Sequence, residues 1–112
     1  AAPNSADGSA GLGELDFQAG RISRAIGYLE RAFKEDPHDS AAGEFLARAR
    51  IRRGEYVQAQ QTLQELIRFR PDDPSAHYLL ARTLLKVGKS DESALEMKKY
   101  QALMSARGPS DQ

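Results

Sequence analysis

Hydrophobic and polar side chains alternate along the chain with the spacing of amphipathic helices. One such stretch covers residues 40–53, and a second with a continuous apolar face covers residues 56–67. Gly54 lies between them and suits a helix end, because glycine readily adopts a positive φ. Pro71 follows the second stretch, and its ring cannot continue a helical hydrogen-bond ladder. This segment therefore predicts two helices joined by a tight turn, with Ser40 as the N-cap of the first.

The same arrangement recurs with a period of 34 residues. Glycine, leucine and proline each occur three times at this spacing, and small residues occupy two further positions. The recurring residues are Gly20, Gly54 and Gly88; Leu12, Leu46 and Leu80; Pro3, Pro37 and Pro71; Gly13, Ala47 and Ala81; and Ala25, Ala59 and Ser93. Small side chains at the same points of every unit let the two helices of a hairpin approach closely, and Leu46 and Leu80 are expected to be buried between helices. The pattern predicts an all-α fold built from helical hairpins.

The period and these residues resemble the tetratricopeptide repeat, a helix–turn–helix unit of the same length. The matching residues are Leu12, Gly13, Ala25, Leu29 and Pro37 in the first unit, Leu46, Ala47, Ala59, Leu63 and Pro71 in the second, and Leu80, Ala81, Ser93 and Met97 in the third. The resemblance implies an α-α superhelix, a right-handed solenoid of three hairpins and six helices. The last helix is expected to be extended, because Ser105 stands where the period would place a proline.

The chain departs from the family pattern at two positions. The family's Trp position holds Ser9, Gly43 and His77, and its Tyr position holds Asp16, Arg50 and Leu84. These smaller or polar side chains predict looser packing within each repeat.

The period also predicts how the chain is divided. The expected division is the end of an upstream repeat or a linker at residues 1–5, repeats at residues 6–39, 40–73 and 74–107, and a flexible tail at residues 108–112. The third repeat includes the extended terminal helix. Pro3 lies one period before Pro37, which indicates further repeats upstream in the intact protein.

Composition and charge narrow the range of functions. The 112 residues include no cysteine, which excludes disulfides and thiolate chemistry, and no apolar run is long enough for a transmembrane helix. The first 13 residues lack the basic and apolar regions of a signal peptide, so a soluble protein is expected and its compartment stays open. Sixteen basic residues balance sixteen acidic ones, which argues against binding to nucleic acid or to an acidic membrane surface. Since no apolar run is long enough to span a membrane, no membrane insertion is expected either. The charge is uneven, however: −3 over residues 6–39, +1 over residues 40–73 and +3 over residues 74–107.

No group of residues predicts catalysis or metal binding. His38 and His77 are 39 residues apart and belong to no metal-binding motif. Acidic pairs at residues 35–36 and 72–73 lie beside the periodic prolines, where aspartate favours turns and caps. The chain contains neither a nucleophile motif nor a phosphate-binding glycine loop. We therefore expect no enzymatic activity, no cofactor and no metal.

The resemblance does imply a binding surface, because the first helix of each repeat in this family lines a concave groove. Carried over to this chain, the groove residues are Glu14, Phe17, Gln18, Glu44, Phe45, Arg48, Arg52, Tyr78, Leu79, Arg82 and Lys86. Four of them are cations that form a basic strip beside aromatic and apolar side chains. We expect a non-catalytic scaffold that binds an extended, acidic protein or peptide segment.

One known binding mode of the family does not transfer. Chaperone-binding repeats hold a C-terminal carboxylate with Lys, Asn and Arg side chains. The matching positions here are Ala10, Glu14, Phe45, Ser75 and Leu79, and none of these residues can replace them.

Two other readings stay open. The chain could be a structural or self-association module at the end of a longer solenoid, and its acidic first unit and basic third unit would then favour head-to-tail contact between copies. It could also be a regulatory appendage of an enzyme encoded upstream.

Overall fold

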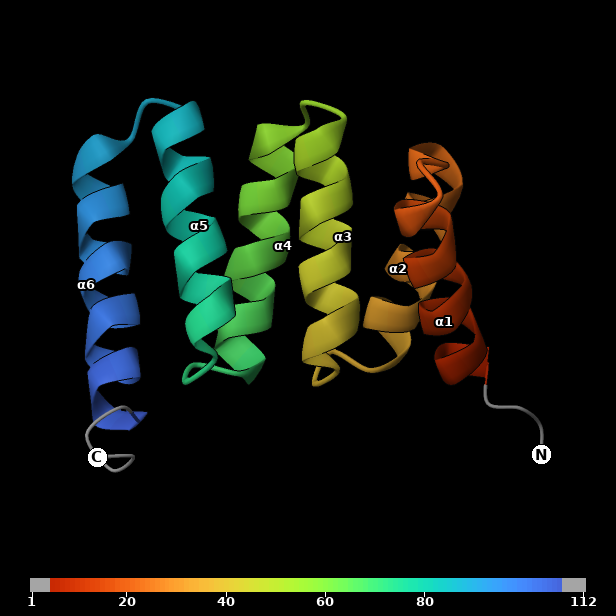
Figure 1. The fold of residues 1–112 in the computed structure, drawn as a ribbon, viewed down its shortest axis with the longest axis horizontal. Helices are drawn as coiled ribbons and strands as arrows, with labels where there is room; N and C mark the ends of the chain where they lie inside the picture. The colour runs from red at the N-terminus through yellow and green to blue at the C-terminus, as the bar shows by residue number, and fades with distance from the viewer. Residues whose placement is uncertain (1–4, 108–112) are drawn as a thin grey trace.

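The computed structural model describes residues 5–107 and consists of six helices there. They are α1 (Ser5–Gln18), α2 (Ile22–Glu35), α3 (Ser40–Arg52), α4 (Tyr56–Phe69), α5 (Pro74–Lys86) and α6 (Ser90–Arg107). Successive helices pair as antiparallel hairpins that stand side by side along the longest dimension of the molecule, which is 41 Å (Figure 1). The all-α repeat fold and the extended last helix are confirmed. The expectations for residues 1–4 and 108–112 lie outside the described residues.

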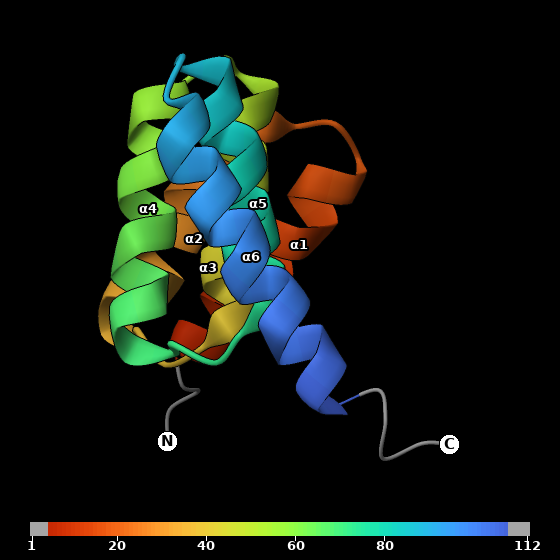
Figure 2. The same cartoon turned by 90° about the vertical axis from the view of Figure 1, so that its left-hand side faces the viewer.

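The row of hairpins is curved because the first helices pack closer together than the second helices do. α3 contacts both α1 and α5, whereas among the described helices α2 and α4 do not come within contact distance of each other. Seen along the row from the α6 end, α1 and α4 lie on opposite sides of the molecule (Figure 2). The side formed by α1, α3 and α5 is therefore the inner, concave side.

Aspartates cap the first helices of the second and third hairpins. The side chain of Asp39 accepts a hydrogen bond from the Ala42 backbone N–H at 3.1 Å, and Asp73 does the same for Ser75 at 3.1 Å. The expectation that Ser40 is the N-cap was wrong, because Ser40 is already the first helical residue. The aspartate one position earlier has the extended backbone and the oxygen that a cap needs.

A glycine closes every first helix. Gly20, Gly54 and Gly88 have φ values of +83°, +78° and +82°, a conformation that only glycine adopts without strain. In the second hairpin the chain reverses here so that the Glu55 N–H reaches the Arg50 carbonyl at 2.8 Å. The periodic glycines thus set the angle between the two helices of each hairpin.

The small residues lie where the helices of a hairpin meet, as the period predicted. A Cβ atom added to Gly13 would stand 2.5 Å from Cγ of Leu29, a residue of α2 with no exposed surface. In the third hairpin the Ser93 hydroxyl donates a hydrogen bond across the same contact to the Ala81 carbonyl at 2.7 Å. The small side chains are therefore required by the distance between the helices.

The family's Trp position is filled in different ways in the second and third repeats. A Cβ on Gly43 would lie 3.0 Å from the ring of Phe33 and 3.1 Å from Leu66, so neighbouring side chains occupy the space that a tryptophan would take. His77 is buried and its ring nitrogens lie 2.6 Å from a carboxylate oxygen of Glu96 and 2.7 Å from the Pro71 carbonyl. The expectation of looser packing does not describe these two sites.

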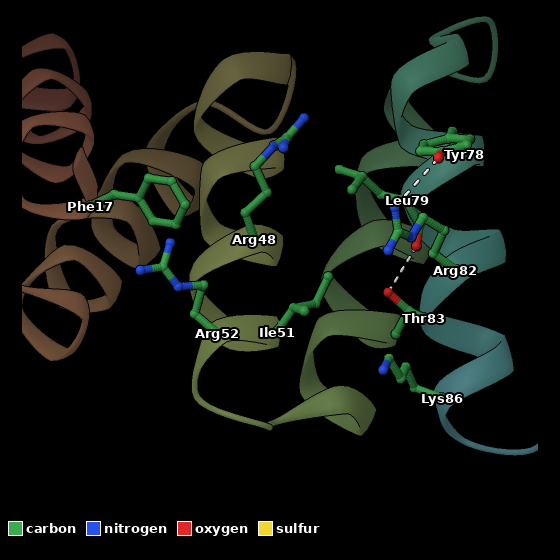
Figure 3. A pocket seen from close by; sticks show the side chains of 9 residues that line it. All are labelled: Phe17, Arg48, Ile51, Arg52, Tyr78, Leu79, Arg82, Thr83 and Lys86. Atoms are coloured by element: carbon green, nitrogen blue, oxygen red, sulfur yellow. Dashed lines mark hydrogen bonds between the residues drawn. The ribbon is translucent and has the colours of Figure 1, made fainter. Parts of the chain in front are cut away.

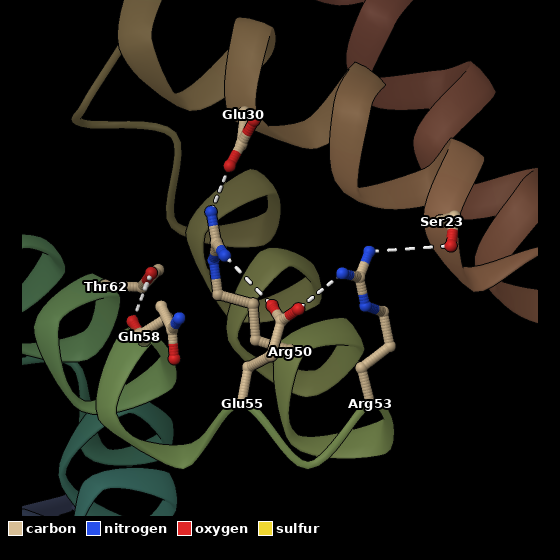
Figure 4. A network of polar contacts seen from close by, with 7 residues as sticks. All are labelled: Ser23, Glu30, Arg50, Arg53, Glu55, Gln58 and Thr62. Carbon is tan, nitrogen blue, oxygen red and sulfur yellow. Dashed lines mark hydrogen bonds and ion pairs between the residues drawn. The ribbon is translucent and has the colours of Figure 1, made fainter.

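Arg50, at the Tyr position, connects three helices through ion pairs (Figure 4). It forms one ion pair with Glu30 of α2 and a second with Glu55 before α4, the latter at 3.1 Å. Glu55 also pairs with Arg53 at 2.5 Å, and Arg53 donates to the Ser23 hydroxyl of α2 at 3.5 Å. An ionic network therefore replaces an aromatic ring between the first and second hairpins.

Two glycines of α1 give opposite predictions for the same substitution. Gly11→Ala should raise the free energy of unfolding by up to about 1 kcal/mol, because alanine favours a helix and a Cβ there has no atom within 4 Å. Gly13→Ala should lower it by roughly 1 kcal/mol or more, because the clash with Leu29 exceeds the gain in helix propensity. Urea titrations of both variants measure the difference. Equal stabilisation by the two alanines would contradict the packing described for this hairpin.

Candidate functional site

A pocket of about 310 Å³ opens on the concave side, between the three first helices. We call it the basic groove, and its lining residues are Phe17, Arg48, Ile51, Arg52, Tyr78, Leu79, Arg82, Thr83 and Lys86. Figure 3 shows Phe17 extending from α1, the next three residues from α3 and the remaining five from α5. Since helical residues four apart share a face, each of α3 and α5 contributes a pair of cations to the wall.

Seven of the eleven residues expected at a ligand groove line this pocket. They are Phe17, Arg48, Arg52, Tyr78, Leu79, Arg82 and Lys86. The other four, Glu14, Gln18, Glu44 and Phe45, do not line it. Of these, Phe45 contacts the lining residue Phe17, with the two rings edge-on and 5.5 Å between their centroids.

Sequence reasoning missed two lining residues, Ile51 and Thr83. Ile51 lies one 34-residue period after Phe17, which was expected in the groove. The repeat pattern therefore contained the information needed to predict it. Thr83 is almost fully buried, and its hydroxyl donates to the Leu79 carbonyl at 2.8 Å. Its hydrogen bond is satisfied within α5, which leaves mainly its methyl group to face the groove, and no sequence signal distinguished it.

The cations of the groove form no ion pairs within residues 5–107; they are Arg48, Arg52, Arg82 and Lys86. By contrast, Arg50 and Arg53, which alternate with the groove arginines along α3, are both paired with carboxylates. In this part of the chain, the arginines that form ion pairs contact neighbouring hairpins, and the arginines without ion pairs line the groove.

Aromatic rings hold two of the groove arginines in place. The Arg52 guanidinium lies over the Phe17 ring, 5.4 Å from its centroid, and the Arg82 guanidinium lies 5.8 Å from that of Tyr78. Tyr78 is itself supported from α6 by Tyr100, at 5.1 Å between centroids. One Arg82 N–H also donates to the Tyr78 hydroxyl at 3.4 Å. Stacking restrains these guanidinium groups without neutralising them, so their remaining hydrogen-bond donors can serve a ligand.

A pair of carboxyl groups links α3 to the start of α5. Burial, and then the neighbouring charge and hydrogen bond of Asp73, raise the pKa of Glu44 from 4.5 to about 7, against a smaller opposing effect of Arg48. One oxygen of Asp73 caps α5, and the other is buried and has no other hydrogen-bond donor within residues 5–107. A protonated Glu44 supplies a donor to Asp73. Glu44 was expected to face a ligand, but it is half-buried and interacts with another helix.

Residues 5–107 contain no group of three or more His, Asp or Glu side chains placed to hold a metal ion. Within the same residues, no helix has the length and apolarity needed to cross a membrane.

The carboxyl pair predicts how Glu44→Gln will depend on pH. Because the pKa of Glu44 is higher in the folded chain than in the unfolded chain, its contribution to stability is lost as the pH rises from about 4.5 through 7. Glutamine stays neutral and can still donate to Asp73. The variant should therefore unfold with a free energy higher by on the order of 1 kcal/mol at pH 8, and the gain should vanish toward pH 4.5.

Thermal or urea unfolding across this pH range measures the effect. Glu65→Gln is the matched control, since Glu65 pairs with Arg68 on the exposed surface at 3.4 Å, where such pairs contribute little. A gain for Glu44→Gln that does not change with pH would show that the two carboxyl groups are not coupled.

Solved structures with the same arrangement of helices share little sequence with this chain. PcrH, in complex with the chaperone binding region of PopB, has a TM-score of 0.88 at 21% identity, with 97% of this chain and 88% of that chain covered. SycD, the type III secretion translocator chaperone of Yersinia enterocolitica, has a TM-score of 0.86 at 19% identity, with 96% and 82% covered. The second TPR of Spaghetti (RPAP3), bound to the HSP90 peptide SRMEEVD, has a TM-score of 0.83 at 19% identity, with 89% and 93% covered.

Comparison at the level of sequence assigns the family. No curated protein sequence matches the chain significantly. The sequence pattern that defines the tetratricopeptide repeat matches residues 16–83, which include parts of all three hairpins and most of the groove. The chain therefore belongs to the tetratricopeptide repeat family.

Proposed function

We propose that this chain is a non-catalytic scaffold that binds an acidic segment of a partner protein in the basic groove. The observation that carries the proposal is the set of four uncompensated cations in one pocket. Like charges held close together repel one another, and none of these four forms an ion pair within residues 5–107. A ligand with carboxylates would remove that repulsion and use the free donors.

The arginines favour carboxylates over other acidic groups in a protein partner. Each guanidinium presents a planar fork of N–H donors that matches the two oxygens of a carboxylate. Because Arg52 and Arg82 are stacked on rings, they lose less side-chain entropy on binding than free arginines would. Aspartate or glutamate side chains of a partner are therefore suitable ligands for the groove.

Charge alone cannot supply a useful affinity. A micromolar complex needs roughly −8 kcal/mol, and exposed ion pairs contribute only about 0–1 kcal/mol each. The groove is also lined by the apolar side chains of Phe17, Ile51 and Leu79. We infer that the ligand carries apolar side chains between its acidic ones, and that burying these supplies much of the binding energy.

Related folds support a peptide as the ligand. PcrH and RPAP3 were both solved with a segment of another protein bound. The positions that hold a C-terminal carboxylate in chaperone-binding repeats are Ala10, Glu14, Phe45, Ser75 and Leu79 here, and they provide no cation. An internal acidic segment therefore fits this chain better than a free C-terminus.

Fluorescence anisotropy with three labelled peptides tests the proposal. The first peptide alternates glutamate and leucine, the second replaces glutamate by lysine, and the third replaces leucine by serine. The first should bind at about micromolar strength, and both replacements should weaken binding at least tenfold. Its affinity should also fall as salt is raised from 0.1 M to 1 M, because the screening length shortens from about 10 Å to about 3 Å.

A double variant locates the binding site. Arg48→Glu with Arg82→Glu should abolish binding, since both residues line the basic groove. The matched control, Arg31→Glu with Arg68→Glu, makes the same change in net charge on α2 and α4, away from the groove, and should bind as the wild type does. If both variants lost peptide binding equally, the loss would be due to overall charge, and this result would overturn the assignment of the binding site to the groove.

A further inference from the structure

A second hollow, of about 290 Å³, opens between the second helices α4 and α6. α5 stands between these two helices along the row and forms the floor, and α4 and α6 do not come within contact distance of each other in the described residues (Figure 1). Four apolar side chains line the hollow, one from α4, two from α5 and one from α6. We call this space the outer hollow, and these side chains are Ile67, Leu80, Leu84 and Leu95.

The equivalent place one period earlier, between α2 and α4, is occupied by an ion pair. Arg50 stands at the position of Leu84, and its guanidinium pairs with Glu30 of α2 and with Glu55 before α4 (Figure 4). In the outer hollow both partners of the first pair are replaced, because Leu84 has no charge and Gln64 stands at the position of Glu30. The outer hollow is therefore the same gap without the ion pair that occupies it in the preceding repeat.

Continuation of the row beyond α6 would not cover the outer hollow. α5 follows the second hairpin, yet it does not come within contact distance of α2. A first helix added after α6 in the same way would not reach α4. The repeat gives a second argument, since Gln61 is exposed although a hairpin follows it, and its equivalent Leu95 is 58% exposed. The exposed leucine is thus a property of this gap and does not depend on the end of the chain.

The charged residues around the outer hollow indicate what kind of ligand it would accept. Lys99 pairs with Glu96 at 3.2 Å, and Glu96 is also held from α5 by His77 at 2.6 Å. Glu92 lies one helical turn before Glu96, is exposed, and forms no ion pair within residues 5–107. A cation of a partner can therefore pair with Glu92 without breaking an existing ion pair.

We propose that the outer hollow binds a segment of a partner protein in which a large apolar side chain stands next to an arginine or lysine. The apolar side chain contacts Leu84 and Leu95, and the cation pairs with Glu92. An apolar cavity of about 150 Å³ can hold a benzene ring, so this hollow has room for one large side chain or two smaller ones.

The outer hollow is separate from the basic groove and selects the opposite charge. Leu80 and Leu84 share one face of α5, whereas Tyr78 and Arg82 share another face and line the groove. Both sites can therefore be occupied at once, and the proposal does not rest on the function proposed for the groove. Because the hollow receives so few side chains, we expect its affinity to be at least tenfold weaker than the micromolar binding in the groove.

An NMR titration of the full chain with labelled leucine methyl groups tests the proposal. The probe is a soluble glycine–serine peptide with one Arg-Leu-Arg triplet. The methyl signals of Leu80, Leu84 and Leu95 should shift and reach saturation, while those of Leu79 in the basic groove should not move. Replacing the peptide's leucine by serine, or both its arginines by glutamate, should weaken binding at the hollow at least fivefold.

Two exposed substitutions identify the side chains that bind the peptide. Leu95→Ser removes one apolar wall and Glu92→Gln removes the free carboxylate, and each should weaken binding at least fivefold. Leu85→Ser and Asp91→Asn are the matched controls, because Leu85 is also 58% exposed and neither residue lines the hollow. Both controls should bind the peptide as the wild type does.

A third variant closes the hollow in the way that the preceding repeat does. Leu84→Arg with Gln64→Glu rebuilds the pair formed by Arg50 and Glu30, and it should abolish the shifts of Leu80 and Leu95. Circular dichroism shows whether this variant is folded, and if it is not, the two exposed substitutions decide.

Three results would overturn the proposal. The first is the absence of saturable shifts at the three leucines of the hollow with the Arg-Leu-Arg peptide. The second is equal binding of the glutamate peptide, which would remove the preference for a cation. The third is a shift of the same leucines with protein concentration alone, which would show that a second copy of the chain occupies the hollow.

Discussion

The close approach of the two helices in each hairpin is the constraint on which the rest of the structure depends. In the first hairpin, glycine at position 13 leaves room for the Leu29 side chain and no more. In the third, Ser93 uses the same short distance for a hydrogen bond to the backbone of the facing helix. The positive φ of the glycine at each turn fixes the angle at which the helices meet. Three hairpins of one shape can then stack with one repeated geometry.

That repeated geometry is sufficient to form the groove. α3 contacts α1 and α5 on the inner side, while α2 and α4 stay apart on the outer side. Every first helix therefore turns the same face toward a shared hollow. Equivalent positions of successive repeats therefore lie next to each other on neighbouring first helices. This is how a pair of cations on α3 and a pair on α5 come to line a single pocket.

The distribution of ion pairs separates structural charges from those available to a ligand. Arg50 on α3 and Arg53 directly after it form ion pairs with carboxylates, whereas Arg48 and Arg52 line the groove and form no ion pair within residues 5–107. The residues alternate along one helix, so neither composition nor local charge density distinguishes them. Only the direction of each side chain relative to the neighbouring helices does so, because a charge is neutralised by what lies within a few ångströms of it.

The sequence by itself determined the helices, their pairing and most of the groove. A period of 34 residues, with small residues and glycines at fixed places, leaves few ways to fold, and the period carried Phe17, Arg48 and Arg82 to the same face. The tertiary structure alone decided how equivalent positions differ. Leu12 and Leu46 are both leucines at the same position of the repeat, yet Leu12 is exposed and Leu46 is buried. The difference arises because burial at this position requires a neighbouring hairpin. Likewise Glu44, expected to meet a ligand, interacts with Asp73, a residue far along the chain that the local pattern around Glu44 does not reveal. Local pattern fixes which face of a helix a residue lies on, but only the packed neighbours fix what that face touches.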